Sequence, residues 1–154
     1  MITINVLWAA FGTIGFCILF HVPLRSFIPA AITGAFAWMT YEISLNNGMT
    51  ETVSIFLGAC TVAILSEVFA RIFKEAATIF IIPGILPLVP GAGIYYTLFA
   101  FIEKNQENLT AYGTQTLMSA GAIAVALMTI SIIFRTYFVI KSSIKTLPDR
   151  LRNR

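Results

Sequence analysis

Charged residues are scarce in this sequence. The chain has 10 Lys and Arg and 7 Asp and Glu in 154 residues, or 11%, against roughly 25% in a typical globular domain. Hydrophobic residues make up 58% even before the 10 Gly are counted, and the mean hydropathy of +0.86 agrees with this excess. Water is therefore not the solvent for most of the chain, which excludes a nucleotide-binding or other bulky soluble enzyme domain.

Cysteine and histidine are nearly absent as well. Cys17 and Cys60 lie in apolar runs, and His21 is the single histidine. This leaves no Cys or His spacing typical of a metal site and no base that would complete a catalytic triad. We therefore predict no disulfide, no metal, no cofactor, no catalytic residues and no enzymatic activity. The net charge of +3 is not accompanied by a basic face on a soluble domain, which nucleic-acid binding would require. We therefore expect no nucleic-acid partner.

Apolar runs separated by polar turns predict an all-α integral membrane protein with one transmembrane domain over residues 1–154. A spanning helix takes about 20 residues, so the length allows at most about seven spans. The polar breaks reduce this to five, at residues 2–20, 27–45, 52–72, 76–102 and 112–140, followed by a basic tail over residues 141–154. No Lys or Arg precedes His21, so the first helix lacks a basic leader and is expected to stay in the mature protein.

Lysine and arginine lie mostly on one side of these spans. Nine of the ten are predicted on the same side, and only Lys104 on the other. The nine are Arg25, Arg71, Lys74, Arg135, Lys141, Lys145, Arg150, Arg152 and Arg154. Basic loops stay in the cytoplasm, so we predict an outside N-terminus and a cytoplasmic C-terminus in a multi-pass protein.

The fourth predicted span is interrupted. Residues 81–96 are apolar enough to be embedded, yet they contain Pro83, Gly84, Pro87, Pro90, Gly91 and Gly93. Because proline lacks an N–H, the carbonyls of Ile79, Pro83 and Leu86 are predicted to lose their helical partners. Irregular backbone at membrane depth is tolerated inside protein or beside a watery cavity, and interrupted helices mark transporter binding sites. The break predicts a site or a gate; the alternative is a kinked helix packed against its neighbours.

The predicted orientation gives this break a direction. A half-helix that begins near Pro90 presents the N–H groups of Gly91, Ala92 and Gly93 at mid-membrane, where a positive helix end favours an anion. We therefore predict that a substrate carboxylate binds here. The freed carbonyls are available to an ammonium group or a coupling ion. The candidate substrate-binding residues are Pro83, Gly84, Pro87, Pro90, Gly91, Ala92 and Gly93.

Glu67 is the only carboxylate well inside an apolar run, and Arg71 follows it by four residues, one helical turn. An ionisable group inside a span is a functional candidate, so Glu67 with Arg71 is the hypothesis for proton coupling. The alternative is an interfacial ion pair between the two. Glu42 lies closer to the end of the second span, where interfacial solvation is the favoured interpretation.

Small residues recur four positions apart on several spans. Ala30 and Gly34 form one such pair, and Ser66 and Ala70 form another. This spacing lets helix backbones approach closely in lipid. We expect ordinary packing within the chain rather than a dedicated subunit interface.

Several of these segments together resemble a known family. They are Leu65-Ser-Glu-Val-Phe-Ala-Arg71, Ala77-Thr-Ile-Phe80 and the proline-rich run Pro83-Gly-Ile-Leu-Pro-Leu-Val-Pro-Gly91. They look like the small five-helix subunit of the two-component threonine/serine exporter family. The first hairpin, Gly15 to Arg25 followed by Gly34 to Trp38, is similar to the same family's, so the likeness covers nearly all of the chain.

The resemblance implies a bacterial cytoplasmic (inner) membrane protein that pairs with a larger exporter-family subunit. Members export threonine and serine, driven by the proton-motive force, and some two-component members are linked to export of dicarboxylates such as succinate. Both substrate classes carry carboxylates. A non-transporting scaffold or assembly subunit of a partner membrane protein is the alternative function. The family supplies no established catalytic residue to carry over.

Overall fold

The computed structural model describes the backbone of residues 2–152 and the side chains of residues 3–137 and 140. Over that range the chain is helical and contains no strand. The helices are α1 (Ile2–Leu19), α2 (Phe27–Asn46), α3 (Glu51–Phe73), α4 (Thr78–Ile85), α5 (Gly91–Ile102) and α6 (Gln106–Arg152), with short 3-10 turns η1 (Leu24–Ser26) and η2 (Leu86–Leu88). The predicted all-α class is confirmed.

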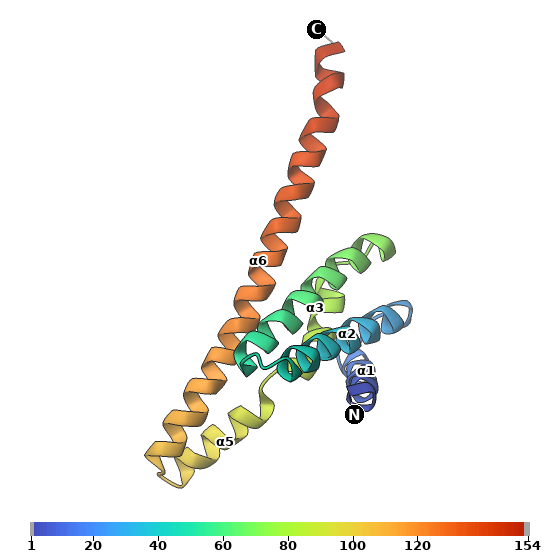
Figure 1. Ribbon diagram of the computed structural model, residues 1–154. Coiled ribbons are helices and arrows are strands. Elements are labelled where there is room, and N and C mark those ends of the chain that lie inside the picture. The colour runs from blue at the N-terminus through green and yellow to red at the C-terminus, as the bar shows by residue number, and fades with distance from the viewer. Residues whose placement is uncertain (1, 153–154) are drawn as a thin grey trace.

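The helices form a bundle with one long helix along its side (Figure 1). α2 packs between α1 and α3, and α4 lies against both α2 and α3. α5 leaves this group and packs on α6, which runs back along α3 and extends beyond it. The connections between helices are short. At the end of α3, for example, Lys74 adopts a left-handed φ of 55° and its N–H donates to the Ala70 carbonyl, which ends the helix.

The core is built from small side chains at the helix crossings. Ala30 of α2 and Cys17 of α1 are both fully buried in one cluster with Phe80. A Cβ on Gly34 would lie 2.0 Å from Thr13 Oγ1, so α1 and α2 approach too closely there for any side chain. Ser66 and Ala70 on α3 are buried as well. The prediction that the small residues serve packing within the chain is confirmed for these two pairs.

Helix length and composition identify fewer membrane spans than five. Within the described residues, α3 and the Gln106–Tyr137 part of α6 are long and apolar enough to cross a membrane. The pair formed by Thr78–Leu88 and Gly91–Ile102 makes a third if it is one bent span. α1 counts as a shorter apolar helix, Thr3–Leu19. The five-span count and the orientation therefore stay predictions.

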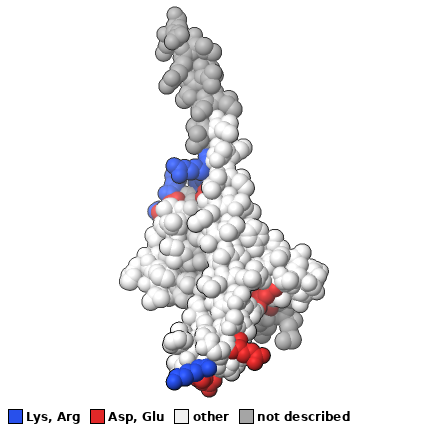
Figure 2. All heavy atoms as spheres, turned by 90° about the vertical axis from the view of Figure 1, so that its left-hand side faces the viewer, with Lys and Arg blue, Asp and Glu red and all other residues white. Residues whose placement is uncertain are grey.

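Charged side chains gather at the ends of the described surface. Figure 2 shows blue atoms at two places, one beside the start of the grey tail and one at the opposite end, with a mostly white band between them. The Lys104 backbone has a φ of 56° in the loop that joins α5 to α6. The side chains of the predicted basic tail, residues 141–154, lie outside the described residues.

The backbone differs from the prediction at two places. α4 continues through Pro83, which is fully buried, so this proline does not end the helix; the regular helix stops further on, at η2 and the two residues after it. α6 begins at Gln106 rather than near residue 112, and its backbone continues into the predicted tail. A helix interior tolerates one proline when packing contacts replace the lost hydrogen bond.

Candidate functional site

A cavity of about 350 Å³ lies where the chain breaks between α4 and α5. Its wall comes from the end of α2, the start of α3, the break itself, the start of α5 and the first part of α6. The lining residues are Trp38, Tyr41, Glu51, Ile55, residues 87–93, Tyr96, Tyr112, Gln115, Thr116 and Ser119. The size is in the range of small-molecule sites in proteins.

The break is a tight turn at Pro90. Pro90 has φ −75° and ψ 64°, the geometry of an inverse γ-turn, and the Gly91 N–H donates to the Val89 carbonyl over 2.7 Å. Because of this turn, the Thr78–Leu88 and Gly91–Ile102 segments are bent by 55°. The chain therefore changes direction abruptly at the cavity wall.

Two of the predicted free backbone groups have partners. The Gly91 N–H donates to the Val89 carbonyl within the turn. Of the three N–H groups predicted to bind an anion at the start of α5, those of Ala92 and Gly93 remain. No described side chain caps this helix end. The Leu86 carbonyl, predicted to lose its partner, accepts the Val89 N–H over 3.2 Å. The expected three-donor site is thus corrected to two donors, because the backbone closes on itself around Pro90.

An acidic side chain also lines the cavity. Glu51, the first residue of α3, accepts a hydrogen bond from Gln115 Nε2 of α6 over 2.5 Å. Among the described residues that line the cavity, none is Lys or Arg. The cavity is thus lined by both a carboxylate and an uncapped helix N-terminus; the first attracts a cation and the second an anion.

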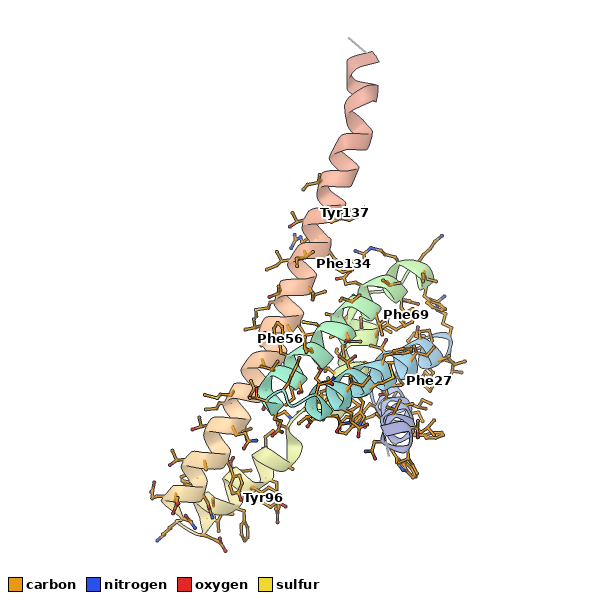
Figure 3. All side chains as sticks on the ribbon, in the orientation of Figure 1. Phe27, Phe56, Phe69, Tyr96, Phe134 and Tyr137 are labelled. Atoms are coloured by element: carbon orange, nitrogen blue, oxygen red, sulfur yellow. The ribbon has the colours of Figure 1, made fainter. Side chains whose placement is uncertain are left out.

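Aromatic rings form a further part of the wall. The ring centroids of Trp38 and Tyr41 are 5.2 Å apart, and those of Tyr96 and Tyr112 are 5.5 Å apart. Tyr96 projects from α5 at the end of the molecule far from Phe69 (Figure 3). Aromatic faces attract ammonium groups through their quadrupoles. These rings therefore favour the same ligand charge as Glu51 does.

The predicted substrate-binding residues separate into two groups. Residues of the break and the start of α5 line the cavity, namely Pro87, Pro90, Gly91, Ala92 and Gly93. Pro83 and Gly84 do not line it; both are buried in α4, where a Cβ on Gly84 would lie 2.8 Å from Thr33 Cγ2. Gly84 therefore allows α4 to pack closely against α2.

The structure pairs Glu67 with Arg71 and keeps both away from the cavity. Arg71 Nη1 lies 2.6 Å from Glu67 Oε2, with side-chain exposures of 36% and 17%. The Arg71 guanidinium also lies 5.2 Å from the ring centroid of Phe134 on α6; Figure 3 labels Phe134. Glu67 follows Glu51 by 16 residues on α3, which is about 24 Å along the helix.

Several lining residues were not predicted from the sequence. Glu51 belongs to a polar turn, and Gln115 and Tyr112 lie on a separate helix. Their meeting depends on the packing of α6 along α3, which no local pattern encodes. Glu42 also differs from its predicted interfacial solvation, because it accepts a hydrogen bond from Asn5 Nδ2 and its Oε2 is buried.

The fold is all-helical over the described residues, with helices long and apolar enough to cross a membrane and a cavity of small-molecule size at a helix break. A family model described as "Threonine/Serine exporter, ThrE" matches residues 5–133. The chain belongs to this family, which is a family of transporters, and the predicted family is thereby confirmed.

One curated relative is an uncharacterized protein of Haemophilus influenzae. It is 23% identical over 99 residues, which are 64% of this chain and 33% of that protein. The chain thus spans about a third of the length of this relative. No solved structure matches the chain.

Proposed function

We propose that this chain is a subunit of a proton-coupled secondary exporter that moves a small hydroxy amino acid, such as threonine or serine, out of the cell. The observation that carries the proposal is the cavity at the break, which is lined both by the start of α5 and by Glu51. Both groups that a free amino acid always carries, a carboxylate and an ammonium, have a complementary partner there.

The chemistry of the two walls assigns the substrate's groups. The carboxylate binds the N–H groups of Ala92 and Gly93 at the uncapped helix end. The ammonium binds the Glu51 carboxylate, either beside the Gln115 amide or in its place. A dicarboxylate such as succinate has a second negative charge, and among the described lining residues there is no Lys or Arg to receive it. The cavity therefore favours a zwitterion over a dianion.

The proposal includes a larger membrane subunit and a location in the bacterial inner membrane. The curated relative is about three times as long as the segment that aligns with this chain, as expected if the two halves are fused there. Only 11% of the most apolar window of α6 is buried within the chain. Its apolar surface is therefore available to lipid and to such a partner.

Glu67 and Arg71 remain the proposal for carrying the proton. Protonation of Glu67 removes the charge that faces Arg71, and the Phe134 ring supplies Arg71 with a second favourable contact. Loss of the ion pair therefore does not leave the guanidinium without an attractive neighbour.

The test is transport in vesicles that contain this chain with and without the larger subunit. Labelled threonine, serine and succinate are supplied, with and without a pH gradient. We expect threonine and serine flux that needs both chains and follows the gradient. Flux of succinate alone would reject the amino-acid assignment, and flux by the partner without this chain would favour the scaffold role.

The site within the cavity is tested by replacing the residues of the break. We expect Pro87→Ala, Pro90→Ala and Gly91→Leu, in the assembled complex at normal protein level, to lower the export rate. Pro83→Ala serves as the matched control, because Pro83 is a proline of the same segment that does not line the cavity. Unchanged export in the first three variants would make the break purely structural.

A further inference from the structure

A second carboxylate lies between α1 and α2, outside the cavity. Asn5 Nδ2 of α1 donates a hydrogen bond to Glu42 Oε1 of α2. The other oxygen, Glu42 Oε2, is buried and has no hydrogen-bond partner among the described residues. A carboxylate with one bonded and one unpaired buried oxygen is costly while it is ionised.

No cation faces Glu42 within the described side chains. The ion pairs that these side chains form are Arg25 with Glu75 and Arg71 with Glu67, at the other end of α2 and α3. The titratable neighbours are Tyr41 and Glu51. Tyr41 is adjacent to Glu42 on α2 and interacts electrostatically with both carboxylates, Glu42 and Glu51. α1 contributes no Asp, Glu, Lys, Arg, His or Tyr, and neither α4 nor η2 contributes any.

A hydrogen-bond donor without a partner lies one turn away. Trp38 precedes Glu42 by four residues on α2, so the two side chains share a face of the helix. Trp38 Nε1 is buried and, like Glu42 Oε2, has no partner among the described residues. A buried donor and a buried acceptor, both unpaired among the described residues, thus lie on the same face of α2.

Trp38 also links Glu42 to the substrate cavity. Its side chain lines the cavity at the break and a second cavity of about 290 Å³. Asn5 lines that second cavity, and Pro87 lines both. A movement of the indole therefore changes the walls of the cavity and the surroundings of Glu42 together.

We propose that Glu42 is a proton-binding carboxylate whose protonation state sets the position of Trp38 in the cavity wall. This inference rests on the proposed function. When Glu42 is ionised, Oε2 accepts the Trp38 indole N–H. When it takes one proton from water, the carboxylate becomes a neutral carboxyl group and the indole is released. The Asn5 amide suits both states, because its NH₂ donates to the carboxylate and its carbonyl oxygen accepts from the carboxyl group.

The experiment compares two kinds of transport by the complete complex. Exchange of labelled for unlabelled threonine across vesicles needs no net proton movement, whereas accumulation driven by a pH gradient does. We expect Glu42→Gln to keep exchange and to lose gradient-driven accumulation. Glu103→Gln, a change of the same chemistry in an exposed loop, is expected to keep both. Gradient-driven accumulation that persists in Glu42→Gln would overturn the proposal.

A second readout does not depend on transport. Infrared difference spectra of the purified protein between low and high pH detect the carbonyl stretch of a protonated carboxyl group. We expect one band in the wild type that is absent from Glu42→Gln and present in Glu103→Gln. Identical spectra for wild type and Glu42→Gln would overturn the proposal even if no threonine flux is found, which separates its failure from failure of the proposed function.

The indole is tested with Trp38→Phe, which keeps an aromatic wall but removes the N–H. We expect this variant to retain the Glu42 infrared band but to show it already at a higher pH, because the ionised carboxylate loses a donor, and to reduce accumulation relative to exchange. A band that appears at the wild-type pH, together with unchanged accumulation, would show that Trp38 does not sense Glu42.

Discussion

Gln115 on α6 donates a hydrogen bond to Glu51 at the start of α3 over 2.5 Å. This contact joins two helices whose contacting residues are 64 positions apart in the sequence. It also fixes the only acidic side chain among the described lining residues against one wall of the cavity. The charge that faces the break is therefore held in place before a ligand arrives.

Glu51→Gln is expected to weaken threonine binding roughly ten- to hundredfold, the usual value of a hydrogen bond to a charged group. The neutral amide keeps the shape of the side chain but removes the charge that faces the ammonium. Binding or the KM of export, measured in the assembled complex, checks this. Glu103→Gln is the control, since Glu103 follows α5 in an exposed loop. An equal loss in both variants would contradict a specific role for Glu51.

Gly93→Ala is expected to destabilise the protein by about 1–3 kcal/mol through overpacking. Its Cβ would lie 2.4 Å from Thr116 Oγ1 of α6. Gly91→Ala is the matched control, because nothing lies within 4 Å of a Cβ at that position. Thermal unfolding in detergent measures the difference, and Gly93→Ala combined with Thr116→Ala should recover stability. A similar loss for both glycines would show that backbone freedom, and not space, governs these positions.

Gly34→Ala is expected to separate α1 from α2 and to lower the unfolding temperature. A methyl group there would collide with Thr13, whose hydroxyl donates to the Ala9 carbonyl over 2.8 Å. Gly12→Ala on α1 has open space around its Cβ, and the better helix propensity of alanine should leave it neutral or stabilised. Cysteine crosslinking between α1 and α2 would detect the separation. Equal crosslinking yields in both variants would count against this packing.

Arg71→Ala is expected to cost only about 1 kcal/mol in stability, because partly exposed ion pairs and cation–π contacts each contribute little. The cost should fall as salt is added, since the pair is screened. Unfolding free energies for Arg71→Ala, Glu67→Gln and the double variant give the coupling between the two side chains. A coupling of several kcal/mol would mean that the pair is a structural anchor and not an accessible proton site.

The helices and their approximate limits could be predicted because each follows from a local pattern. Apolar runs gave the extents of α1, α2 and α3, and the run of prolines located the segment where regular helix stops. Pro83 lies inside α4, so it does not mark the end of the regular helix, whereas Pro87 and Pro90 lie where the helix is interrupted. The local pattern also missed the bond between the Gly91 N–H and the Val89 carbonyl, because a γ-turn depends on the ψ of Pro90.

The cavity was less predictable than the helices. The residues of the break are contiguous, so their chemistry could be inferred from proline and glycine alone. Glu51 and Gln115 come from separate elements, and only the packing of α6 against α3 brings them together. Glu42 lies near a predicted span end, where hydropathy indicates water, but its partner Asn5 comes from the preceding helix.

The γ-turn at Pro90 has a mechanical consequence. The pyrrolidine ring fixes φ of Pro90, and the hydrogen bond from the Gly91 N–H to the Val89 carbonyl restrains its ψ. Neither backbone torsion of Pro90 is therefore free to rotate. α5 is packed on α6 and is joined to the rest of the chain through this rigid corner. A movement that widens the cavity at this corner must therefore turn at Val89 or η2 and must also shift α6 along α3, against which it is packed.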